Sequence, residues 1–447
     1  MAERTIIRGA TIVSMDPTIG DFPRGDILVE HGKIRAIGSD LGPMDAQVLD
    51  ADGMIAMPGF VDTHRHIWQS CMRYSCVDCS AQAYFEDMLF TRGGGYTPED
   101  VRIGTLMGTL SAIESGITTL LDWSHIQNSP EHTDASIAAL RESGMRAVFA
   151  HGWPLVEPAA WMVESDRAHP QDIARLRRDY FASDDGLVTL AMAARGPEMA
   201  SSSVWKADLE LARSLGIRST IHMGAFPFNG EKSAIAEMQR AGALGEDLTF
   251  VHCNCSSDEE LTMMADHGIT VSLGINVEMN AQGIGDIPLD RLLARGIRPS
   301  LSGDTEACGC GDMFTQMRGA LGHYRSWMGG GHSREKNAPA TLASRDVLEF
   351  ATIEGARANG LLSKVGTLAV GKSADIILIN ARHLNLFPMS EPVATVVAGA
   401  HPGNVDTVMV EGRILKRGGE LVGFDLDGIR QQAAASQERI LGRGVDA

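Results

Sequence analysis

The chain has 447 residues, of which 44% are hydrophobic and 21% charged, so it can bury a large core and has room for two or three domains. Its 57 acidic and 39 basic side chains give a formal net charge of −18, and that field would repel nucleic acid and anionic membrane surfaces. We therefore expect a small-molecule substrate and neither nucleic acid nor membrane as partner. One local arginine would still allow a small anionic substrate.

Seven cysteines are too few and too irregularly spaced for a disulfide framework. Cys71, Cys76 and Cys79 lack the second CxxC pair of a thiolate metal site, so we interpret them as buried or loop thiols. Cys308 and Cys310 receive the same interpretation. This usage fits a reducing compartment, and the chain has neither a signal-peptide pattern nor an apolar run of roughly 20 residues. We expect a soluble, cytoplasmic protein.

Residues 1–57 predict a small β unit. The segments TIIRGATIVSMD, GDILVEHGKIRAIGS and AQVLDADGMIAM are rich in Val and Ile, are interrupted by Gly and Asp, and have no helical period. We assign these residues to the N-terminal part of a β-sandwich.

Between residues 58 and 366, short apolar runs alternate with amphipathic stretches of helical length. The eight candidate strands are GFVDTH, TTLLDWSH, RAVFAHG, LVTLAMAAR, STIHMG, LTFVHC, TVSLGI and RPSLSGD. Several of the intervening stretches end in Gly, which tolerates the left-handed conformation that closes a helix. Eight β–α alternations over roughly 300 residues predict an α/β fold, a (β/α)₈ TIM barrel.

After residue 366 the β character returns in VGTLAVGKSADIILIN and VDTVMVEGRILKRGGELVG. The simplest architecture is one composite β-sandwich built from residues 1–57 and 367–447, with the barrel of residues 58–366 inserted between them. The last stretch, DGIRQQAAASQERILGRG, predicts an amphipathic tail helix.

The first candidate barrel strand ends in the triplet His64-Arg65-His66. Such a triplet is weak evidence alone, but side chains of a strand alternate between its faces. His64 and His66 therefore point the same way, and Arg65 points the other way, toward packing or an ion pair. The carboxyl ends of barrel strands are where catalytic residues gather.

Other strand ends carry similar residues. His222 ends the fifth candidate strand, His252 the sixth and Asp304 the eighth. His125 and His151 follow the second and third strands. Histidines placed by chance would be spread over helices and loops, so this distribution predicts that several of them converge on a metal ion.

Imidazole nitrogens with one carboxylate suit Zn²⁺, and Fe²⁺, Mn²⁺ or Co²⁺ are also possible. Three histidines and one aspartate leave a position for water, whose pKa the metal lowers toward neutral. The expected nucleophile at physiological pH is hydroxide bound to one divalent metal.

The sequence resembles the amidohydrolase superfamily, in particular its cytosine-deaminase-like branch, which includes triazine hydrolases and the deaminases of S-adenosylhomocysteine, guanine and 8-oxoguanine. The segments PGFVDTHRH, IHMG, FVHC, LSGD and VGTLAVGKSADIILI occur in the family's order and span essentially the whole chain. The resemblance implies a barrel with a composite β-sandwich, an enzyme acting on C–N bonds other than peptide bonds, and homo-oligomers, either dimers or tetramers.

The same resemblance implies one metal bound by His64, His66, His222 and Asp304. Asp304 would also take a proton from the metal-bound water, and His252 would either polarise the substrate or hold the group that is attacked. Two-metal relatives carry a carbamylated lysine on the fourth strand, but LVTLAMAAR has none, which favours a single ion.

One position departs from the family's pattern. Deaminases of this branch continue the fifth-strand motif as H-x-x-E, and the glutamate shuttles a proton to the substrate, whereas here that position is Ala225. General acid–base help contributes roughly 10²- to 10⁴-fold. Either another group donates the proton, with His125 the first candidate and Glu278 and Glu306 the others, or the reaction does not need it.

Further residues near the strand ends are expected to contact the substrate, and the aromatic ones favour a planar or apolar molecule. They are Trp68, Gln69, Trp123, His151, Glu278 and Glu306. We predict a mononuclear metal-dependent hydrolase, a hydrolytic deaminase or related C–N hydrolase, of a small cyclic or heteroaromatic substrate. The alternative is a non-deaminating reaction at the same site, such as amide, lactam or halide hydrolysis, or lyase or isomerase chemistry.

Overall fold

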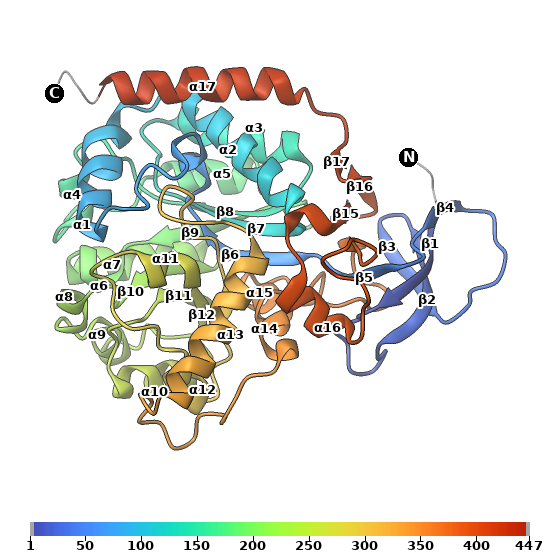
Figure 1. Cartoon of the computed structure of the whole chain (residues 1–447). Coiled ribbons are helices and arrows are strands. Elements are labelled where there is room, and N and C mark those ends of the chain that lie inside the picture. Colours follow the sequence, from blue (N-terminus) through green and yellow to red (C-terminus); the bar gives the residue numbers. More distant parts are fainter. Residues whose placement is uncertain (1–3, 444–447) are drawn as a thin grey trace.

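The computed structural model describes residues 4–443 and contains two sheets, one of them surrounded by helices (Figure 1). The surrounded sheet has eight parallel strands that follow one another in chain order. They are β6 (Phe60–Arg65), β7 (Ile117–Ser124), β8 (Arg146–His151), β9 (Val188–Ala194), β10 (Ser219–Met223), β11 (Leu248–His252), β12 (Thr270–Leu273) and β13 (Ser300–Leu301). Asp304, just after β13, forms a parallel bridge to Arg65 and so brings the two edges together. The predicted (β/α)₈ barrel and its eight strands are confirmed.

The barrel strands are buried along nearly their whole length, which is why they read as continuous apolar runs. The helices and turns that connect the strands lie around the barrel (Figure 1). In chain order they are η1 (Ile67–Met72), α1 (Ala81–Tyr84), η2 (Phe85–Arg92), η3 (Gly93–Gly95), α2 (Pro98–Glu114), α3 (Pro130–Ser143), α4 (Pro158–Met162), α5 (Asp172–Asp179), α6 (Gly196–Met199), α7 (Ser202–Ser214), α8 (Pro227–Gly230), α9 (Ala234–Arg240), α10 (Asp258–Asp266), α11 (Ile275–Asn280), α12 (Leu289–Ala294), α13 (Met313–Gly329), α14 (Ser344–Phe350) and α15 (Ile353–Ala358).

The second sheet joins the two ends of the chain, as predicted. Its strands are β1 (Arg4–Ile12), β2 (Phe22–Glu30), β3 (Lys33–Gly38), β4 (Gln47–Asp50), β5 (Met54–Pro58), β14 (Ile376–Asn380), β15 (Val405–Val410), β16 (Arg413–Arg417) and β17 (Glu420–Leu421). β5 pairs antiparallel with β14, with Met57 opposite Ile377, so hydrogen bonds link the N- and C-terminal strands into one nine-stranded sheet. The short helices α16 (Pro392–Ala394), η4 (Thr395–Gly399) and η5 (Pro402–Asn404) lie between β14 and β15.

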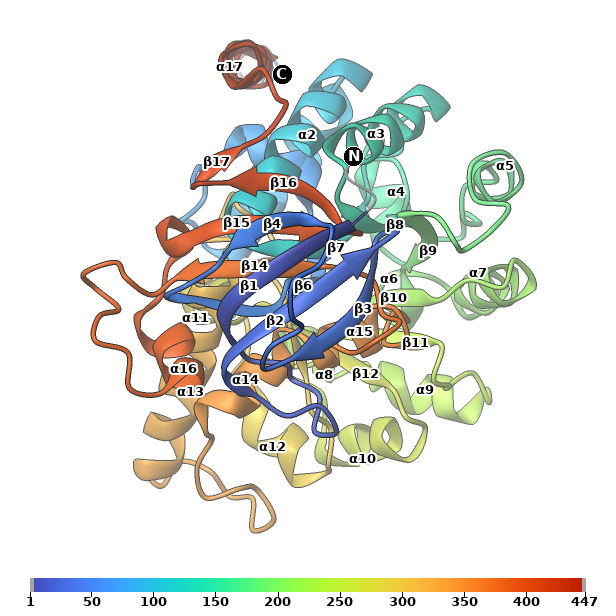
Figure 2. The same ribbon diagram turned by 90° about the vertical axis from the view of Figure 1, so that its right-hand side faces the viewer.

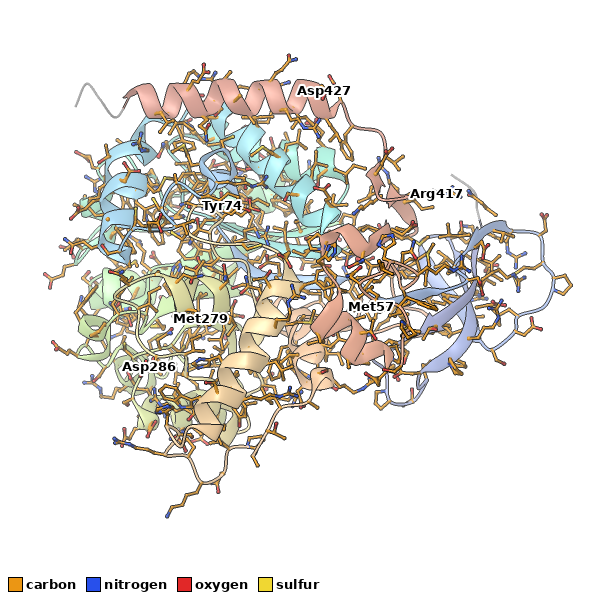
Figure 3. The ribbon with its side chains drawn as sticks, viewed as in Figure 1. Met57, Tyr74, Met279, Asp286, Arg417 and Asp427 are labelled. Carbon is orange, nitrogen blue, oxygen red and sulfur yellow. The ribbon has the colours of Figure 1, made fainter. Side chains whose placement is uncertain are left out.

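The two faces of this sheet bury different cores, as the alternation of strand side chains requires. Ile377 and Met57 belong to the large core that the sheet shares with the barrel (Figure 3). Ile376 packs in a smaller core with Ile7 and Ile27 on the other face, which is turned toward the viewer in Figure 2. The sheet therefore supports the barrel on one side and closes its own core on the other.

The predicted tail helix is α17 (Leu426–Arg443), which lies along the barrel beside α2 (Figure 1). Ser436 Oγ and Arg439 donate hydrogen bonds to Asp100 at 2.7 and 2.6 Å, and Gln437 Nε2 donates to the carbonyl of Cys71 at 2.9 Å. The C-terminal helix thereby holds the segment that follows β6. Within residues 4–443, no helix is both long enough and apolar enough to cross a membrane.

The predicted boundaries near residues 57 and 366 remain predictions. β5 ends at Pro58 and β6 begins at Phe60, while Val365 packs with the barrel and Leu368 with the terminal sheet. All seven cysteines are free thiols.

Candidate metal centre and active site

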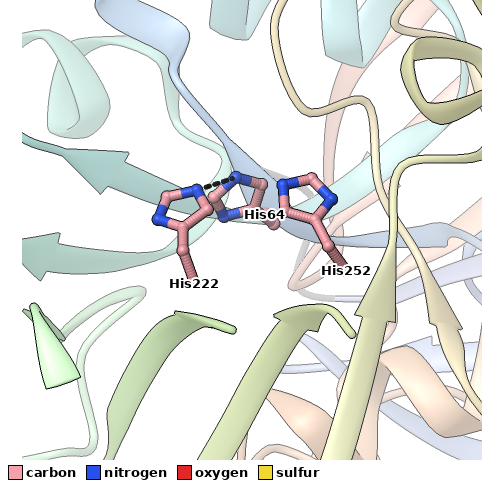
Figure 4. Close-up of side chains that lie close together, drawn as sticks. All are labelled: His64, His222 and His252. Atoms are coloured by element: carbon pink, nitrogen blue, oxygen red, sulfur yellow. Dashed lines mark hydrogen bonds between the residues drawn. The ribbon is translucent and has the colours of Figure 1, made fainter. Parts of the chain in front are cut away.

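Three imidazoles and one carboxylate meet at the carboxyl end of the barrel. The Nε2 atom of His64, on β6, lies 3.2 Å from His222 Nε2, on β10 (Figure 4). The same His64 atom lies 3.4 Å from Asp304 Oδ1. His66 Nε2 lies 3.8 Å from the same carboxylate oxygen. His252 borders this group, since His64, His222 and His252 each offer a nitrogen within 4.8 Å of the others.

Backbone pairing between the first and last strands positions two of these residues. The Asp304 amide donates to the His64 carbonyl at 3.0 Å, and the His66 amide donates to the Asp304 carbonyl at 2.8 Å. Asp304 adopts a left-handed φ of 52°, an uncommon conformation for a residue other than glycine. A Cβ on Gly274 would come within 2.9 Å of Asp304 Cβ, so the absence of a side chain there makes room for the aspartate.

Hydrogen bonds on the far side of two rings fix which nitrogen faces the site. His66 Nδ1 lies 3.0 Å from the Trp123 carbonyl, which can only accept, so Nδ1 donates and Nε2 keeps its lone pair. His252 Nδ1 lies 2.9 Å from Glu278 Oε1, which also accepts from the Gly274 amide at 3.0 Å. Glu278 therefore orients His252 from behind.

The electrostatics of this group suit a cation. Burial lowers the pKa of His64, His66 and His222, so their imidazoles are neutral and offer lone pairs. Burial alone would raise the pKa of Asp304, but its hydrogen bond with His64 and the nearby imidazoles hold that pKa below its usual range. Ligands of a tetrahedral ion with bonds of 2.0–2.1 Å stand about 3.3 Å apart. The closest spacings between these side chains match that geometry.

A cavity of about 770 Å³, a volume that includes space open to solvent, begins at these residues and is walled mainly by aromatic and apolar side chains. Its lining comprises His66, Cys79, Ser80, Ala81, Tyr84, Phe85, Leu89, Trp123, His125, Trp153, Met162, Glu198, Met199, His222, Ala225, Phe226, Asn229, His252, Val277, Ala281, Ile284, Asp304, Thr305 and Cys308. This lining includes no lysine or arginine among the described residues. A flat molecule without negative charge fits such a wall best.

Two further predicted site residues line the cavity, the expected substrate contact Trp123 and the expected catalytic residue His125. Trp123 is the last residue but one of β7, and His125 directly follows the strand. The centroid of the His125 ring lies 4.4 Å from that of His66 and 5.2 Å from that of Trp123. Burial lowers the pKa of His125 to about 3, so its ring is neutral at physiological pH. These two residues form the wall next to the predicted metal ligands.

Three other predicted contacts lie behind the cavity instead. The chain enters η1 directly after His66, and this turn carries Trp68 against Tyr96, with ring centroids 4.9 Å apart. The same turn directs Gln69 Nε2 to the Tyr84 hydroxyl at 2.8 Å. His151, on β8, is turned toward His169 instead, with 3.0 Å between their ring nitrogens.

The two glutamates expected near substrate are also engaged elsewhere. Glu278 is the fourth residue of α11, which starts right after β12, and its side chain reaches back to His252. Glu306 Oε2 accepts from Ser70 Oγ at 2.7 Å and from Arg73 Nε at 2.9 Å, which ties the η1 turn to the loop after β13. Neither carboxylate lines the cavity.

Arg65 points away from the site, as the strand alternation predicted. Its Nε donates to Asp62 Oδ2 at 2.8 Å, and its guanidinium also bonds to the Gly311 carbonyl. This buried pair holds the segment after β13 against β6.

Sequence reasoning missed several residues of the cavity wall. Glu198 lies on α6 just after β9 and lines the cavity. The glutamate in RGPEM closely follows a predicted strand, and this position alone could have indicated a site residue. Tyr84, Phe85 and Phe226 come from α1, η2 and the loop before α8, which have no strand or helix period that marks them.

A parallel barrel with histidines and an aspartate converging at its carboxyl end defines a class of metal-dependent hydrolases. The chain belongs to the Amidohydrolase family, whose model matches residues 55–415. The resemblance inferred from the sequence is thereby confirmed, and the protein is a hydrolase of a metal-dependent family that acts on C–N bonds.

Relatives of known activity are similar over nearly the whole chain. A 5'-deoxyadenosine deaminase of Methanosarcina mazei is 28% identical over 98% of both chains. A 5-methylthioadenosine/S-adenosylhomocysteine deaminase of Moorella thermoacetica is 26% identical over 96% of this chain and 98% of the relative.

Solved structures share the fold. A zinc-bound adenosine deaminase from Xanthomonas campestris has a TM-score of 0.84 at 20% identity, covering 98% of both chains. Atrazine chlorohydrolase TrzN from Arthrobacter aurescens TC1, complexed with zinc, has a TM-score of 0.83 at 22% identity, covering 97% of this chain and all of that one. The cytoplasmic location and the homo-oligomeric state expected from the sequence stay predictions.

Proposed function

We propose that the protein is a mononuclear zinc hydrolase that releases ammonia from an uncharged, aminated heteroaromatic molecule of the purine nucleoside type. The observation that carries the proposal is the convergence of His64, His66, His222 and Asp304 at the base of an aromatic cavity. Full-length similarity to purine nucleoside deaminases supports the reaction type.

In this proposal the four side chains hold one ion. Three neutral imidazoles and one carboxylate are a donor set that suits zinc, and iron or manganese would be accepted by the same ligands. The bound ion would supply a water whose pKa is lowered toward neutrality. The orientation of His66 by the Trp123 carbonyl is the kind of outer contact that metal-binding histidines use.

The residues around the ion would transfer protons and bind the substrate. Asp304 is ionised and takes a proton from the attacking water, then returns it to the departing amine. His252, held by Glu278, faces the same point and would bind the oxygen that adds to the ring. His125 borders the substrate next to His66 and contacts the group that leaves.

The wall of the cavity supports an uncharged substrate. Tyr84, Phe85, Trp123, Trp153 and Phe226 offer ring faces and edges for a planar molecule, and no cationic side chain of the described lining would neutralise a carboxylate. We therefore favour 5'-deoxyadenosine or methylthioadenosine, which are uncharged, over S-adenosylhomocysteine, which carries an amino acid tail.

A panel assay tests the function. Zinc-loaded protein is incubated with 5'-deoxyadenosine, methylthioadenosine, S-adenosylhomocysteine and an aminated triazine, and ammonia release is measured. We expect the two uncharged nucleosides to be the best substrates, by about tenfold or more in kcat/KM over S-adenosylhomocysteine, the factor that roughly 1.4 kcal/mol supplies. No ammonia from any of the four would contradict the proposal.

A second reaction at the same site is kept because Ala225 provides no acid at the end of β10. Displacement of a halide by water leaves an anion that needs no protonation. A chlorinated triazine tested in the same assay separates the two reactions. Chloride release without ammonia release from any aminated substrate would establish the second candidate in place of the first.

A further inference from the structure

Hydrolytic deamination, the reaction on which this inference rests, needs a proton at a second place. When water adds to an aromatic C=N bond, negative charge develops on the ring nitrogen, and an acid near that nitrogen lowers the barrier. Asp304 is occupied with the attacking water, and Ala225 offers nothing. The acid must therefore come from another part of the cavity wall.

Glu198 and Asp304 are the two carboxyl groups in the described lining of the cavity. Glu198 lies on α6 and is 93% buried, with 7% of its surface exposed. Its Oε1 accepts a hydrogen bond from the Gly224 amide at 2.7 Å. That amide directly precedes Ala225 and follows His222 by two residues, so the Glu198 carboxyl lies at the turn after β10, beside a predicted metal ligand.

The second oxygen of this carboxyl is left for a ligand. Within residues 4–443, Oε2 of Glu198 has no hydrogen-bond partner, and the Glu198 side chain lines the cavity. Gly196 makes this placement possible, because its φ of 63° turns the chain and a Cβ there would come within 2.9 Å of Ile221 Cγ2.

Few charged groups surround Glu198, and their effects on its pKa oppose one another. Lys232 Nζ donates to the backbone carbonyl of Glu198 at 2.8 Å, and Glu260 is held nearby by the amide of Ile235 at 3.0 Å. Burial, helped by the charge of Glu260 and opposed by the Gly224 hydrogen bond, Lys232 and His252, raises the pKa of Glu198 to about 7. Such a carboxyl can both give and take a proton at neutral pH.

We propose that Glu198 is the catalytic acid and base that protonates the ring nitrogen of the aminated substrate. The Glu198 carboxyl gives its proton to that nitrogen while the water oxygen bonds to the ring carbon and Asp304 takes one proton from the water. The C–N bond to the amino group then breaks as Asp304 returns its proton to the leaving nitrogen, giving ammonia. The remaining hydroxyl proton passes to Glu198, which leaves a carbonyl and an N–H in the product.

His125 was the first candidate for this role on sequence grounds, but its contacts place it elsewhere. Its ring packs against those of His66, Trp68 and Trp123 on the β6–β7 side of the cavity. Glu198 instead contacts the turn after β10, and so the two groups would reach different edges of a flat substrate.

Kinetics of Glu198→Gln test the proposal, with Glu260→Gln as the matched control because Glu260 is a buried neighbour outside the cavity. With zinc-loaded protein and 5'-deoxyadenosine, we expect Glu198→Gln to lower kcat by about 10²- to 10⁴-fold with KM and zinc content within about threefold of wild type. The control should keep kcat within about threefold. A Glu198→Gln kcat near that of wild type, or a raised KM with kcat unchanged, overturns the assignment.

Difference infrared spectroscopy supplies a readout that does not depend on turnover. We expect zinc-loaded wild type to show a neutral carboxylic C=O band at pH 6 that is lost by pH 8.5 and is missing from Glu198→Gln. If the band is absent at pH 6, Glu198 has no proton to give and the proposal is wrong. If the band is present but wild type releases no ammonia from the panel, the proposed function fails while Glu198 is established as a neutral acid, so the two failures are distinct.

Discussion

The base and the wall of the cavity are built in different ways. At the base, His64, His222 and Asp304 sit at the ends of barrel strands, and backbone hydrogen bonds between β6 and the chain after β13 fix two of them. Much of the wall comes from the segments that connect the strands, such as Phe85 of η2 and Phe226 of the loop before α8, and both of these rings are only partly buried. The contrast assigns the chemistry to the strand ends and the choice of substrate to the loops.

Removing a residue of the base should have the largest effect. His222→Ala deletes one of four proposed ligands, so we expect loss of zinc and a fall in ammonia release greater than the roughly 10- to 100-fold typical of outer contacts. Zinc per chain and kcat/KM are the measurements. His332→Ala, at an exposed position, should leave both unchanged, and a fully metallated, active His222→Ala would refute the ligand assignment.

Glu278 tests how much the support behind the base contributes. Glu278→Gln weakens the hydrogen bond that orients His252, so we expect kcat to fall about 10- to 100-fold while zinc content stays near one per chain. Steady-state kinetics with metal analysis checks this. Unchanged kcat would mean that the orientation of His252 does not matter for the reaction.

Substitutions in the wall should change KM and leave kcat nearly constant. Phe226→Ala removes a half-buried ring from the cavity, and we expect KM to rise about three- to tenfold with kcat nearly constant. Phe228, stacked on Phe226 at 5.4 Å but 62% exposed and outside this cavity, is the matched control, and Phe228→Ala should change KM less. A loss confined to kcat would place Phe226 in the chemistry.

Glu198 lies between the two regions. We expect its ionised form to lower the free energy of unfolding of the wild-type protein. Its pKa of about 7 lies above the usual 4.5 for glutamate, so the folded state binds a proton more tightly than the unfolded state, and stability falls as pH rises through this range. Glu198→Gln has no such proton to lose. Thermal melts should show the variant gaining about 1–3 kcal/mol over wild type at pH 8 and little at pH 4.5; a variant less stable than wild type at pH 8 would contradict this.

The base was predictable from sequence because two regularities coincide. Buried parallel strands read as short apolar runs, and His64, His222 and Asp304 stand where such runs stop. The strand pattern no longer predicts where a side chain points once the chain has entered a loop. Gln69 turns away because η1 starts at Ile67, and nothing periodic indicates that turn.

Long-range pairing explains the remaining differences. Residue patterns typical of strands at both ends of the chain predicted the composite sheet. Its continuity depends on the pairing of β5 with β14, which these patterns do not specify. Glu306 was predicted beside the substrate, yet its position depends on Ser70 and Arg73, more than two hundred residues away in the chain. Such contacts are properties of the folded barrel.

The location of bound zinc tests the central claim most directly. Anomalous diffraction at the zinc edge, on crystals of the zinc-loaded protein, should give one peak per chain about 2.0–2.2 Å from nitrogens of His64, His66 and His222 and from a carboxylate oxygen of Asp304. A peak at the thiols of Cys76 and Cys79, or no peak at the base of the cavity, would contradict the account.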